Sequence, residues 1–328
     1  MKVKKALTPI LAVVALVLTA TGLWFSAAVG SGATSRSSLT IIAGANPGGG
    51  WDTTARAIQQ VARDHNIVGN VQVVNIPGAG GTIALTKLSE MTGNENTILV
   101  TGGGMIASAE IAQPGVQISD VTPVVKYTEE YSVVVVPADS PFQTMEDYVA
   151  AWKSNPQSIA VGGASIGNTD HLLASKTALA SGLTVDEMKY IPFEGGGDLL
   201  NSLLSHSVDV GYTGYKEVQD QVENGTLRVL GISSAERQPG LDDIPTFTES
   251  GVDVVASNWR GFVAPPGISE EARQELTNIL QEVHDTEDWT QMAERNSWSD
   301  ALVTGDDATR FFEEEHKNAI DLVEVLGL

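Results

Sequence analysis

Residues 39–52 read LTIIAGANPGGGWD, a β-branched run that passes directly into a glycine-rich turn. After the turn, Ala55, Ile58, Val61 and Ala62 recur at three-and-four spacing, which predicts a helix with one apolar face. A strand, a glycine-rich turn and a helix in this order are the repeating unit of α/β sheets. The opening of the chain therefore favours an α/β fold.

The same alternation continues through most of the chain. Strands are expected at residues 39–43, 71–75, 97–100, 132–136, 159–161, 188–191, 208–212 and 229–232. Segments with apolar residues at helical spacing separate most of these runs, which implies parallel sheets covered by helices on both faces. After residue 266 only helices are expected, at about 270–285, 287–296 and 306–325.

Two interruptions divide this pattern. The first is the Pro-Ala-Asp-Ser-Pro stretch of Pro137–Pro141, and the second is Asn258–Pro266. Two breaks around a middle α/β block suggest that the chain leaves one lobe, builds another and returns. We therefore expect residues 39–137 and 258–328 to form lobe one and residues 138–257 to form lobe two, with a hinge at the crossings.

The net charge of the chain is strongly negative. Its 328 residues include 19 Lys and Arg against 41 Asp and Glu, which gives −22, or −25 once the three leader lysines are left out. A field of this sign repels phosphate backbones, which argues against a nucleic-acid partner and suits a solubilising surface. The chain has no cysteine, so disulfides, thiolate metal sites, a cysteine nucleophile and a lipidated leader cysteine are excluded.

Residues 1–33 are predicted to be a membrane-targeting segment. Three lysines among the first five residues precede an apolar run over residues 6–25 and a small-residue stretch that ends at 33. This is the pattern of an export signal, with cleavage after Ala28 or Ala33. The run is also close to the roughly 20 residues that span a bilayer, so retention as an N-terminal anchor is the alternative. In either case we expect an extracytoplasmic protein, in the periplasm or at the outer face of the cytoplasmic membrane.

Glycine-rich turns follow several of the expected strands. They lie at 46–52 (NPGGGWD), 77–82 (PGAGGT), 101–104 (TGGG), 162–169 (GGASIGNT) and 193–198 (FEGGGD). In open α/β sheets ligands bind at this edge, where glycine lets the backbone approach and helix N-termini direct N–H groups at an anion. One such turn alone is commonly no more than a tight turn. Their joint recurrence indicates a pocket of amide donors and small hydroxyls.

Two other functions share parts of this pattern. Nucleotide binding fails on spacing, because the third glycine of G-x-G-x-x-G after Gly78 would fall at Ile83, and no G-x-x-x-x-G-K-[ST] is present. A serine hydrolase is suggested by G-x-S-x-G at 163–167, but the His-Gly-Gly-Gly oxyanion loop is missing. The late histidines also lie in helical segments. Ser165 is therefore interpreted as a hydrogen-bond donor, and the chain as a binding protein without catalytic residues.

Neither a cofactor nor a metal ion is expected, because histidines and carboxylates do not gather at metal-ligand spacing. His171 is interpreted as a helix-start or core histidine. Asp52 either caps the first helix or faces the pocket. Trp51 and Trp259 belong either to the core or to the lining of the cleft. Arg260 is one of the few cations that could meet an anion there.

Seven short motifs follow one another in a specific order along the chain. They are PGGGWD (47–52), NIPGAGG (75–81), GNTDH (167–171), IPFEGGG (191–197), DVG (209–211), LRVL (227–230) and DIPT (243–246). In this order and spacing, from about residue 39 to residue 328, they resemble the substrate-binding receptors of tripartite tricarboxylate transporters. The resemblance implies a two-lobed, periplasmic-binding-protein-like (flytrap) fold that captures an organic acid in the cleft between its lobes.

The resemblance also implies a site and partners. The ligand carboxylate is expected between the loop after the first strand and a small-residue loop of lobe two, and a tricarboxylate such as citrate is expected most. The candidate ligand-binding residues are Gly48, Gly49, Gly50, Trp51, Asp52, Thr101, Gly102, Gly103, Ser165, Thr169, Phe193, Gly195, Gly196, Thr213, Asn258 and Trp259. Lys126 and Lys216 are further candidate cations. The expected partners are a small organic acid and the membrane subunits of the transporter, with the receptor a monomer. The alternative is a receptor that reports its ligand to a membrane signalling protein.

Overall fold

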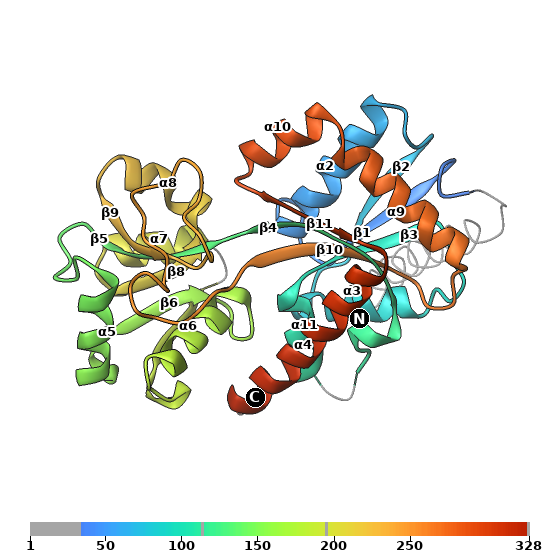
Figure 1. Ribbon diagram of the computed structural model, residues 1–328. Coiled ribbons are helices and arrows are strands. Elements are labelled where there is room, and N and C mark those ends of the chain that lie inside the picture. Colours follow the sequence, from blue (N-terminus) through green and yellow to red (C-terminus); the bar gives the residue numbers. More distant parts are fainter. Residues whose placement is uncertain (1–33, 113–114, 194–195, 327–328) are drawn as a thin grey trace, which may run out of the picture.

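The computed structural model describes residues 34–112, 115–193 and 196–326. They form two lobes, each a sheet with helices on both faces, joined by two long strands (Figure 1). The expected leader, residues 1–33, lies outside the described residues. Among the described residues, no helix has the length and hydropathy that crossing a bilayer requires.

Lobe one is built on a six-stranded sheet. Its strand order is β11 (Ser299–Thr304), β4 (Thr122–Glu130), β10 (Asn258–Ala264), β3 (Thr97–Thr101), β1 (Leu39–Ala43) and β2 (Val71–Asn75). One face is covered by α2 (Gly50–Asp64), α9 (Glu270–His284) and α10 (Glu287–Arg295), and the other by α3 (Thr82–Ser89), α4 (Gly103–Ile111) and α11 (Gly305–Leu326) (Figure 1). An apolar layer therefore fills the space on each side of the sheet.

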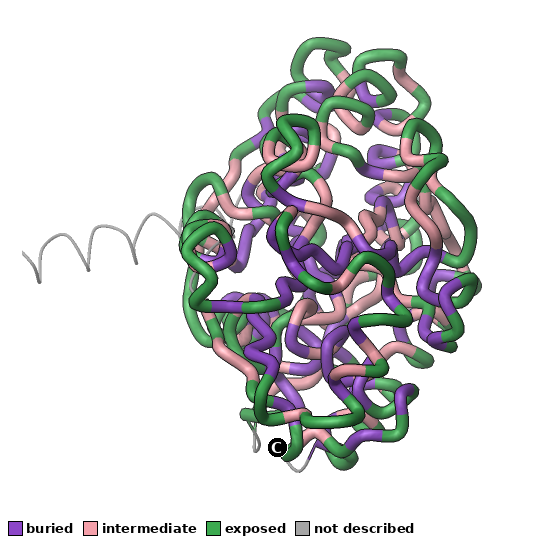
Figure 2. Tube along the Cα trace, turned by 90° about the vertical axis from the view of Figure 1, so that its left-hand side faces the viewer, coloured by how far each residue is buried: buried purple, intermediate pink, exposed green. Residues whose placement is uncertain are grey.

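Lobe two repeats this plan with a five-stranded sheet. The strand order is β7 (Lys189–Phe193), β6 (Ala160–Ala164), β8 (Val210–Gly214), β5 (Ser132–Pro137) and β9 (Leu227–Ile232). Helices α5 (Met145–Ser154) and α6 (Thr169–Ala180) pack on one face, and α7 (Gly196–Leu204) and α8 (Tyr215–Glu223) on the other. Figure 2 shows the buried residues inside both lobes, with exposed segments around them.

The α/β class and the two lobes are confirmed, but three details of the sequence prediction are wrong. Strands β4, β10 and β11 were not expected: β10 lies in the second interruption, at 258–266, and β11 lies after residue 266, where only helices were expected. The sheets are mixed and not purely parallel, because β10 runs antiparallel to β3 and β4, and β5 antiparallel to β8 and β9. Antiparallel pairing is possible here because these strands enter the sheets from the opposite lobe.

The first crossing between the lobes also differs from the prediction. Strand β5, which the sequence assigned to lobe one, pairs with β8 and β9 in the sheet of lobe two. The chain therefore crosses at Tyr131, between β4 and β5, and Pro137 only ends a strand of lobe two. The return crossing leads into β10, which begins at Asn258.

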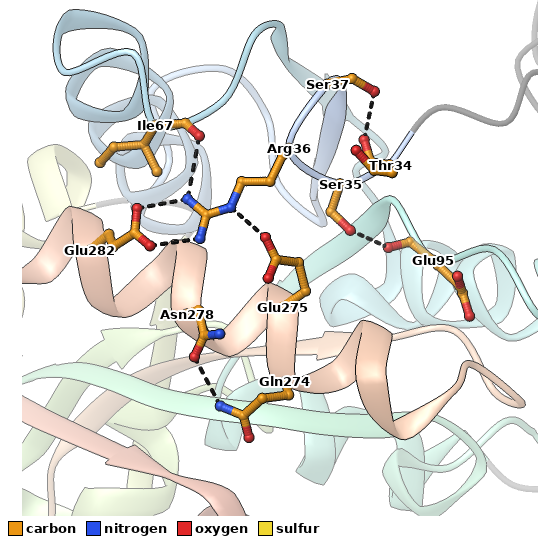
Figure 3. A network of polar contacts seen from close by, with 10 residues as sticks. All are labelled: Thr34, Ser35, Arg36, Ser37, Ile67, Glu95, Gln274, Glu275, Asn278 and Glu282. Atoms are coloured by element: carbon orange, nitrogen blue, oxygen red, sulfur yellow. Dashed lines mark hydrogen bonds and ion pairs between the residues drawn. The ribbon is translucent and has the colours of Figure 1, made fainter.

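The start of the described chain is held on lobe one by a cluster of polar contacts (Figure 3). The Arg36 guanidinium donates to Glu275 and, at 2.6 Å, to both carboxylate oxygens of Glu282 on α9. The Ser35 hydroxyl donates to the backbone oxygen of Glu95 at 3.0 Å. These contacts fix the point at which the preceding segment joins the folded body.

Candidate functional site

The two lobes approach each other where the strands of each sheet end. A methyl group built on Gly104, in the first turn of α4, would lie 3.7 Å from Thr169 Oγ1 in α6 of lobe two. A methyl group built on Gly167 would lie 3.0 Å from Ile111 Cδ1 of lobe one. A cavity of about 80 Å³ beside these contacts is lined by both lobes, including Gly103 and Thr169. Residues of both lobes can therefore contact one small ligand.

The helices that begin at this cleft have no side-chain caps. The N-cap residues of α2, α4, α6 and α8 are Gly49, Gly102, Asn168 and Gly214, and none makes a side-chain cap hydrogen bond. In contrast, α5, α9 and α10 begin away from it and are capped by Thr144, Ser269 and Thr286. The first backbone N–H groups of a helix have no partner within the helix, and they carry partial positive charge. The cleft therefore collects N–H donors suited to an anion.

Asp52 orders the loop before α2. Its carboxylate is 2 % exposed and accepts hydrogen bonds from Gly48 N at 2.8 Å, Arg56 Nε at 2.9 Å and Asn75 Nδ2 at 2.8 Å. Burial alone would raise the pKa of Asp52, but the hydrogen bonds from Arg56, Gly48 and Asn75 more than offset it and lower the pKa. The carboxylate thus holds the Gly48–Gly50 backbone in place, with the N–H of Gly48 bound to Asp52 and the N–H of Gly49 bound to the backbone oxygen of Asn46 at 3.0 Å.

The two tryptophans have different positions. Trp259 is 3 % exposed, and its Nε1 donates to Glu315 Oε2 of α11 at 2.6 Å, so most of its ring belongs to the core of lobe one. Trp51 is half-buried at the start of α2, where methyl groups built on Gly81 and Gly102 would meet its ring at 2.8 and 3.4 Å. Trp51 thus packs three glycine-rich turns together.

Arg260 is the buried cation of the site. It is 5 % exposed on β10, and its Nη2 donates to Glu130 Oε1 of β4 at 2.6 Å. Asn258 Nδ2 donates to the same oxygen at 2.8 Å. A methyl group built on Gly50 would lie 2.9 Å from Arg260 Nη2, so the guanidinium lies at the N-terminus of α2. Sequence reasoning missed Glu130, because β4 itself was not expected.

Ser165 has no catalytic partner among the described hydrogen bonds. Its side chain is exposed, and His171 Nδ1 accepts a hydrogen bond from Gly167 N at 3.2 Å. Burial lowers the pKa of His171, which is the behaviour of a core histidine. Thr169, at the start of α6, is half-buried at the contact between the lobes.

The remaining candidates are spread over four elements, β3, β7, β8 and α7. Thr101 is fully buried and donates to Met105 Sδ at 3.4 Å, so its side chain lies inside lobe one. Phe193 ends β7 and packs against Gly162 of β6. Thr213 Oγ1 donates to Glu217 Oε2 at 2.8 Å. Gly195 lies outside the described residues, and Gly196 begins α7.

The two candidate lysines already have partners. Lys126 Nζ donates to Glu129 Oε2 at 2.7 Å and lies 5.0 Å from the centre of the Phe311 ring. Lys216 Nζ donates to Gln219 Oε1 at 2.9 Å on the exposed side of α8. Of the three cations that the sequence suggested, Arg260 alone adjoins the uncapped start of α2.

Carboxylates face this cation from the second lobe. Burial, the charge of Glu217 and the charge of Glu130 raise the pKa of Asp170 to about 7, although the N–H of Ala164 acts in the opposite direction. Partial desolvation and the charge of Glu130 raise the pKa of Glu217, while Thr213 and Arg260 lower it. The charge of Glu130 thus acts on both carboxylates of lobe two, and the charge of Arg260 acts on Glu217.

The chain is similar to a group of bacterial receptors. The profile of the tripartite tricarboxylate transporter family receptor matches residues 54–328. A "UPF0065 protein in gbd 5'region" of Cupriavidus necator is 25% identical over 303 residues, 88% of each chain.

Solved structures share this fold. A TctC solute binding protein from Polaromonas has a TM-score of 0.74 at 22% identity, over 88% of this chain and 98% of that one. An adipate-bound R. palustris protein has a TM-score of 0.75 at 21% identity, over 88% and 97%. MatC from Rhodopseudomonas palustris, with bound malate, has a TM-score of 0.71 at 21% identity, over 87% and 98%. The chain therefore belongs to the tripartite tricarboxylate transporter receptor family, whose members are solute-binding receptors and not enzymes.

Proposed function

We propose that the protein captures a small organic carboxylate in its interlobe cleft and delivers it to the membrane subunits of a tripartite transporter. The observation that carries this proposal is the set of four helices, α2, α4, α6 and α8, that begin at the cleft without side-chain caps. A carboxylate there would accept hydrogen bonds from backbone N–H groups that no side chain occupies. The malate and adipate bound to two structural neighbours are ligands of this chemical class.

Capture requires both lobes. The Gly48–Gly50 loop and Arg260 belong to lobe one, whereas Ser165 and Thr169 belong to lobe two. Neither set surrounds an anion alone, so binding energy is gained when the lobes close and water leaves the cleft. The crossings at Tyr131 and Asn258 are the places at which the backbone would bend.

The proposed location is the outer side of the cytoplasmic membrane, where a monomer meets its transporter. The lysine-rich start and apolar run of residues 1–33 support this location. The high negative charge, −22 for the whole chain, keeps such a carrier soluble and opposes its self-association. Fractionation of the native host tests the location, and recovery of full-length protein from the cytosol would contradict it.

A thermal-shift screen tests the function. A ligand that binds only the folded state stabilises it, by about 2.7 kcal/mol when the ligand concentration is a hundred times its Kd. The unfolding temperature rises as a result. The screen should include monocarboxylates, dicarboxylates such as malate and adipate, citrate, which the family resemblance favours, and amino acids. We expect at least one carboxylate to stabilise the protein, and uncharged amides of the same acids to have no effect. If no carboxylate stabilises the protein, the proposed function is wrong.

A further inference from the structure

The cavity between the lobes has a helix of lobe two on one side and the last helix of lobe one on the other. These helices are α6 and α11, and both lie on the lower side of the molecule in Figure 1. Helix α6 lines the cavity with residues 169, 172, 173 and 176, and α11 lines it with residues 315, 318, 319 and 322. Both sets have the i, i+3, i+4, i+7 spacing of a single helix face. Each helix therefore turns one continuous face toward the same space.

These two faces are matched in character but are not joined. Leu172 of α6 and Leu322 of α11 are apolar residues of the two faces, and both are only half-buried. Among the described residues, no hydrogen bond or ion pair connects α6 with α11. The cavity of about 80 Å³ separates them. Its closure would bury apolar surface that is still accessible and add contacts between the two helices.

Each face also carries one charge, and the two charges are opposite. Among the described residues that line the cavity, Lys176 of α6 is the single cation and Glu315 of α11 is the single carboxylate. Lys176 is half-buried and makes no hydrogen bond or ion pair with any described residue. Its ammonium group is therefore free to pair with a carboxylate of the opposite lobe.

Glu315 is held in place by uncharged donors. Its Oε2 accepts a hydrogen bond from Trp259 Nε1 at 2.6 Å, and its Oε1 accepts one from Asn318 Nδ2 at 3.3 Å. Neither donor carries a charge, so the charge of Glu315 has no cationic counterpart within the described parts of the chain. Because the carboxylate is already ordered, pairing with a lysine would cost little further conformational entropy on its side.

We propose that Lys176 and Glu315 form an ion pair when the lobes close, and that this pair, with the apolar residues beside it, latches α6 onto α11. A lysine has a long and flexible stem, so its ammonium can reach across the narrowing cavity to the fixed carboxylate. The latch forms after closure, so it slows the release of a ligand more than it speeds capture. Its effect on affinity rests on the proposed capture of a carboxylate, whereas its effect on the lobes requires no ligand.

A double-mutant cycle on the full chain tests the latch, with malate, adipate and citrate as probes. Lys176→Met removes the charge and keeps the length of the side chain, and Glu315→Gln keeps an acceptor for Trp259. We expect each change to weaken the tightest-binding probe about two- to fivefold, through faster dissociation, as for an ion pair that solvent still reaches. The double variant should bind no more weakly than either single variant. Additive losses, or affinities equal to wild type, would overturn the proposal.

Two neighbours on α11 provide matched controls. Lys317 and Glu314 are exposed and do not line the cavity. Lys317→Met and Glu314→Gln change the net charge of the protein in the same way as the two test variants, and both should keep the wild-type affinity. Equal losses in the control and test variants would show that net charge determines affinity and that there is no latch.

The separation of the lobes gives a readout that needs no ligand. Because the chain has no cysteine, Asp64→Cys on α2 and Lys153→Cys on α5 place two spin labels at known, exposed positions, one on each lobe. In the unliganded protein we expect Lys176→Met to deplete the compact component of the label distances, and Lys317→Met to leave it unchanged. Where a probe binds, the double-mutant cycle decides. Where none binds, the proposed function fails, and an unchanged distance distribution then overturns the latch as well.

Discussion

Gly50 lies directly against the guanidinium of Arg260, so that a methyl group on this glycine would come within 2.9 Å of Nη2. The contact joins the N-terminus of α2 to β10, the strand by which the chain returns from lobe two. A cation beside the positive end of a helix is unfavourable unless an anion balances both. Glu130 supplies part of this balance, and a ligand carboxylate would supply the rest.

Gly50→Ala should therefore weaken ligand binding without unfolding the protein. The added methyl group displaces a flexible guanidinium and not backbone, so the fold tolerates it, but the Arg260–Glu130 geometry is lost. A disturbed hydrogen bond to a charged group costs roughly 1.5–3 kcal/mol, which is about ten- to a hundredfold in Kd. Titration of the best ligand measures this. Gly115→Ala is the control, since its methyl group meets nothing nearer than 4.0 Å. Equal affinities in the two variants would contradict the contact.

Asp52→Asn should destabilise the protein even without ligand. The amide cannot accept all the bonds from Gly48, Arg56 and Asn75, and its own donors face donors. We expect a loss of roughly 2–3 kcal/mol in urea unfolding at pH 7, because charge-assisted bonds are lost at a buried site. Because the pKa of Asp52 is lowered by folding, this contribution is present above about pH 4 and disappears as the pH falls through the folded pKa. The difference from wild type should therefore shrink at low pH.

Asp64→Asn provides the comparison for this result. Asp64 is exposed at the last residue of α2, where a negative charge opposes the helix dipole. Its replacement should leave stability unchanged or slightly higher. A loss as large as that of Asp52→Asn would show that charge on α2, and not the ordering of the loop, determines the effect.

The sequence predicted the elements whose patterns are local. Strand β1 was predicted with its observed bounds, Leu39–Ala43, because its β-branched run is followed by a glycine-rich turn. Strand β10 was not predicted, because Asn258–Ala264 contains Gly261 and Arg260, and its stability comes from neighbours far away in the sequence. Pairing of β10 with β3 and β4 decides its structure, and no local pattern encodes this.

The same limit applied to the site. Backbone donors could be inferred from the glycine-rich turns, but the pairing of Glu130 with Arg260 required the positions of two unpredicted strands. One signal in the sequence could have indicated which helix N-termini lie at the cleft. Helices α5, α9 and α10 begin with Thr144, Ser269 and Thr286, whereas helices at the cleft begin with glycine or asparagine. Replacement of a good cap by glycine marks an N-terminus left open for another partner.

Ser165→Ala should reduce affinity only slightly. The hydroxyl is exposed at the cleft and has no hydrogen bond to a histidine among those described, so it contributes at most one neutral hydrogen bond to the ligand. Such a bond is worth about 0.5–1.5 kcal/mol, which is a several-fold change in Kd and at most about tenfold. Titration of the ligand measures this change. Covalent labelling of Ser165 by a fluorophosphonate, together with ester hydrolysis that the variant lacks, would contradict the expectation.

The pH dependence of stability should reveal Asp170. Its pKa rises from 3.8 in the unfolded chain to about 7 in the folded protein, so the folded state holds a proton that the unfolded state has lost. A raised carboxyl pKa contributes stability that is fully present below about pH 4 and is lost as the pH rises through 7. Between pH 5 and 8 the unliganded wild type should therefore lose on the order of 2 kcal/mol more than Asp170→Asn, which cannot titrate. Urea unfolding at pH 5, 6, 7 and 8 measures the slope of the free energy of unfolding against pH for both proteins.

The contributions of all other groups cancel in this comparison except those of Glu217 and Glu130, whose charges act on Asp170 itself. Asp220→Asn, which changes an exposed acid of α8, should keep the wild-type slope. If Asp170→Asn keeps it too, Asp170 is ionised in the open cleft, and the two lobes do not bring these carboxylates together.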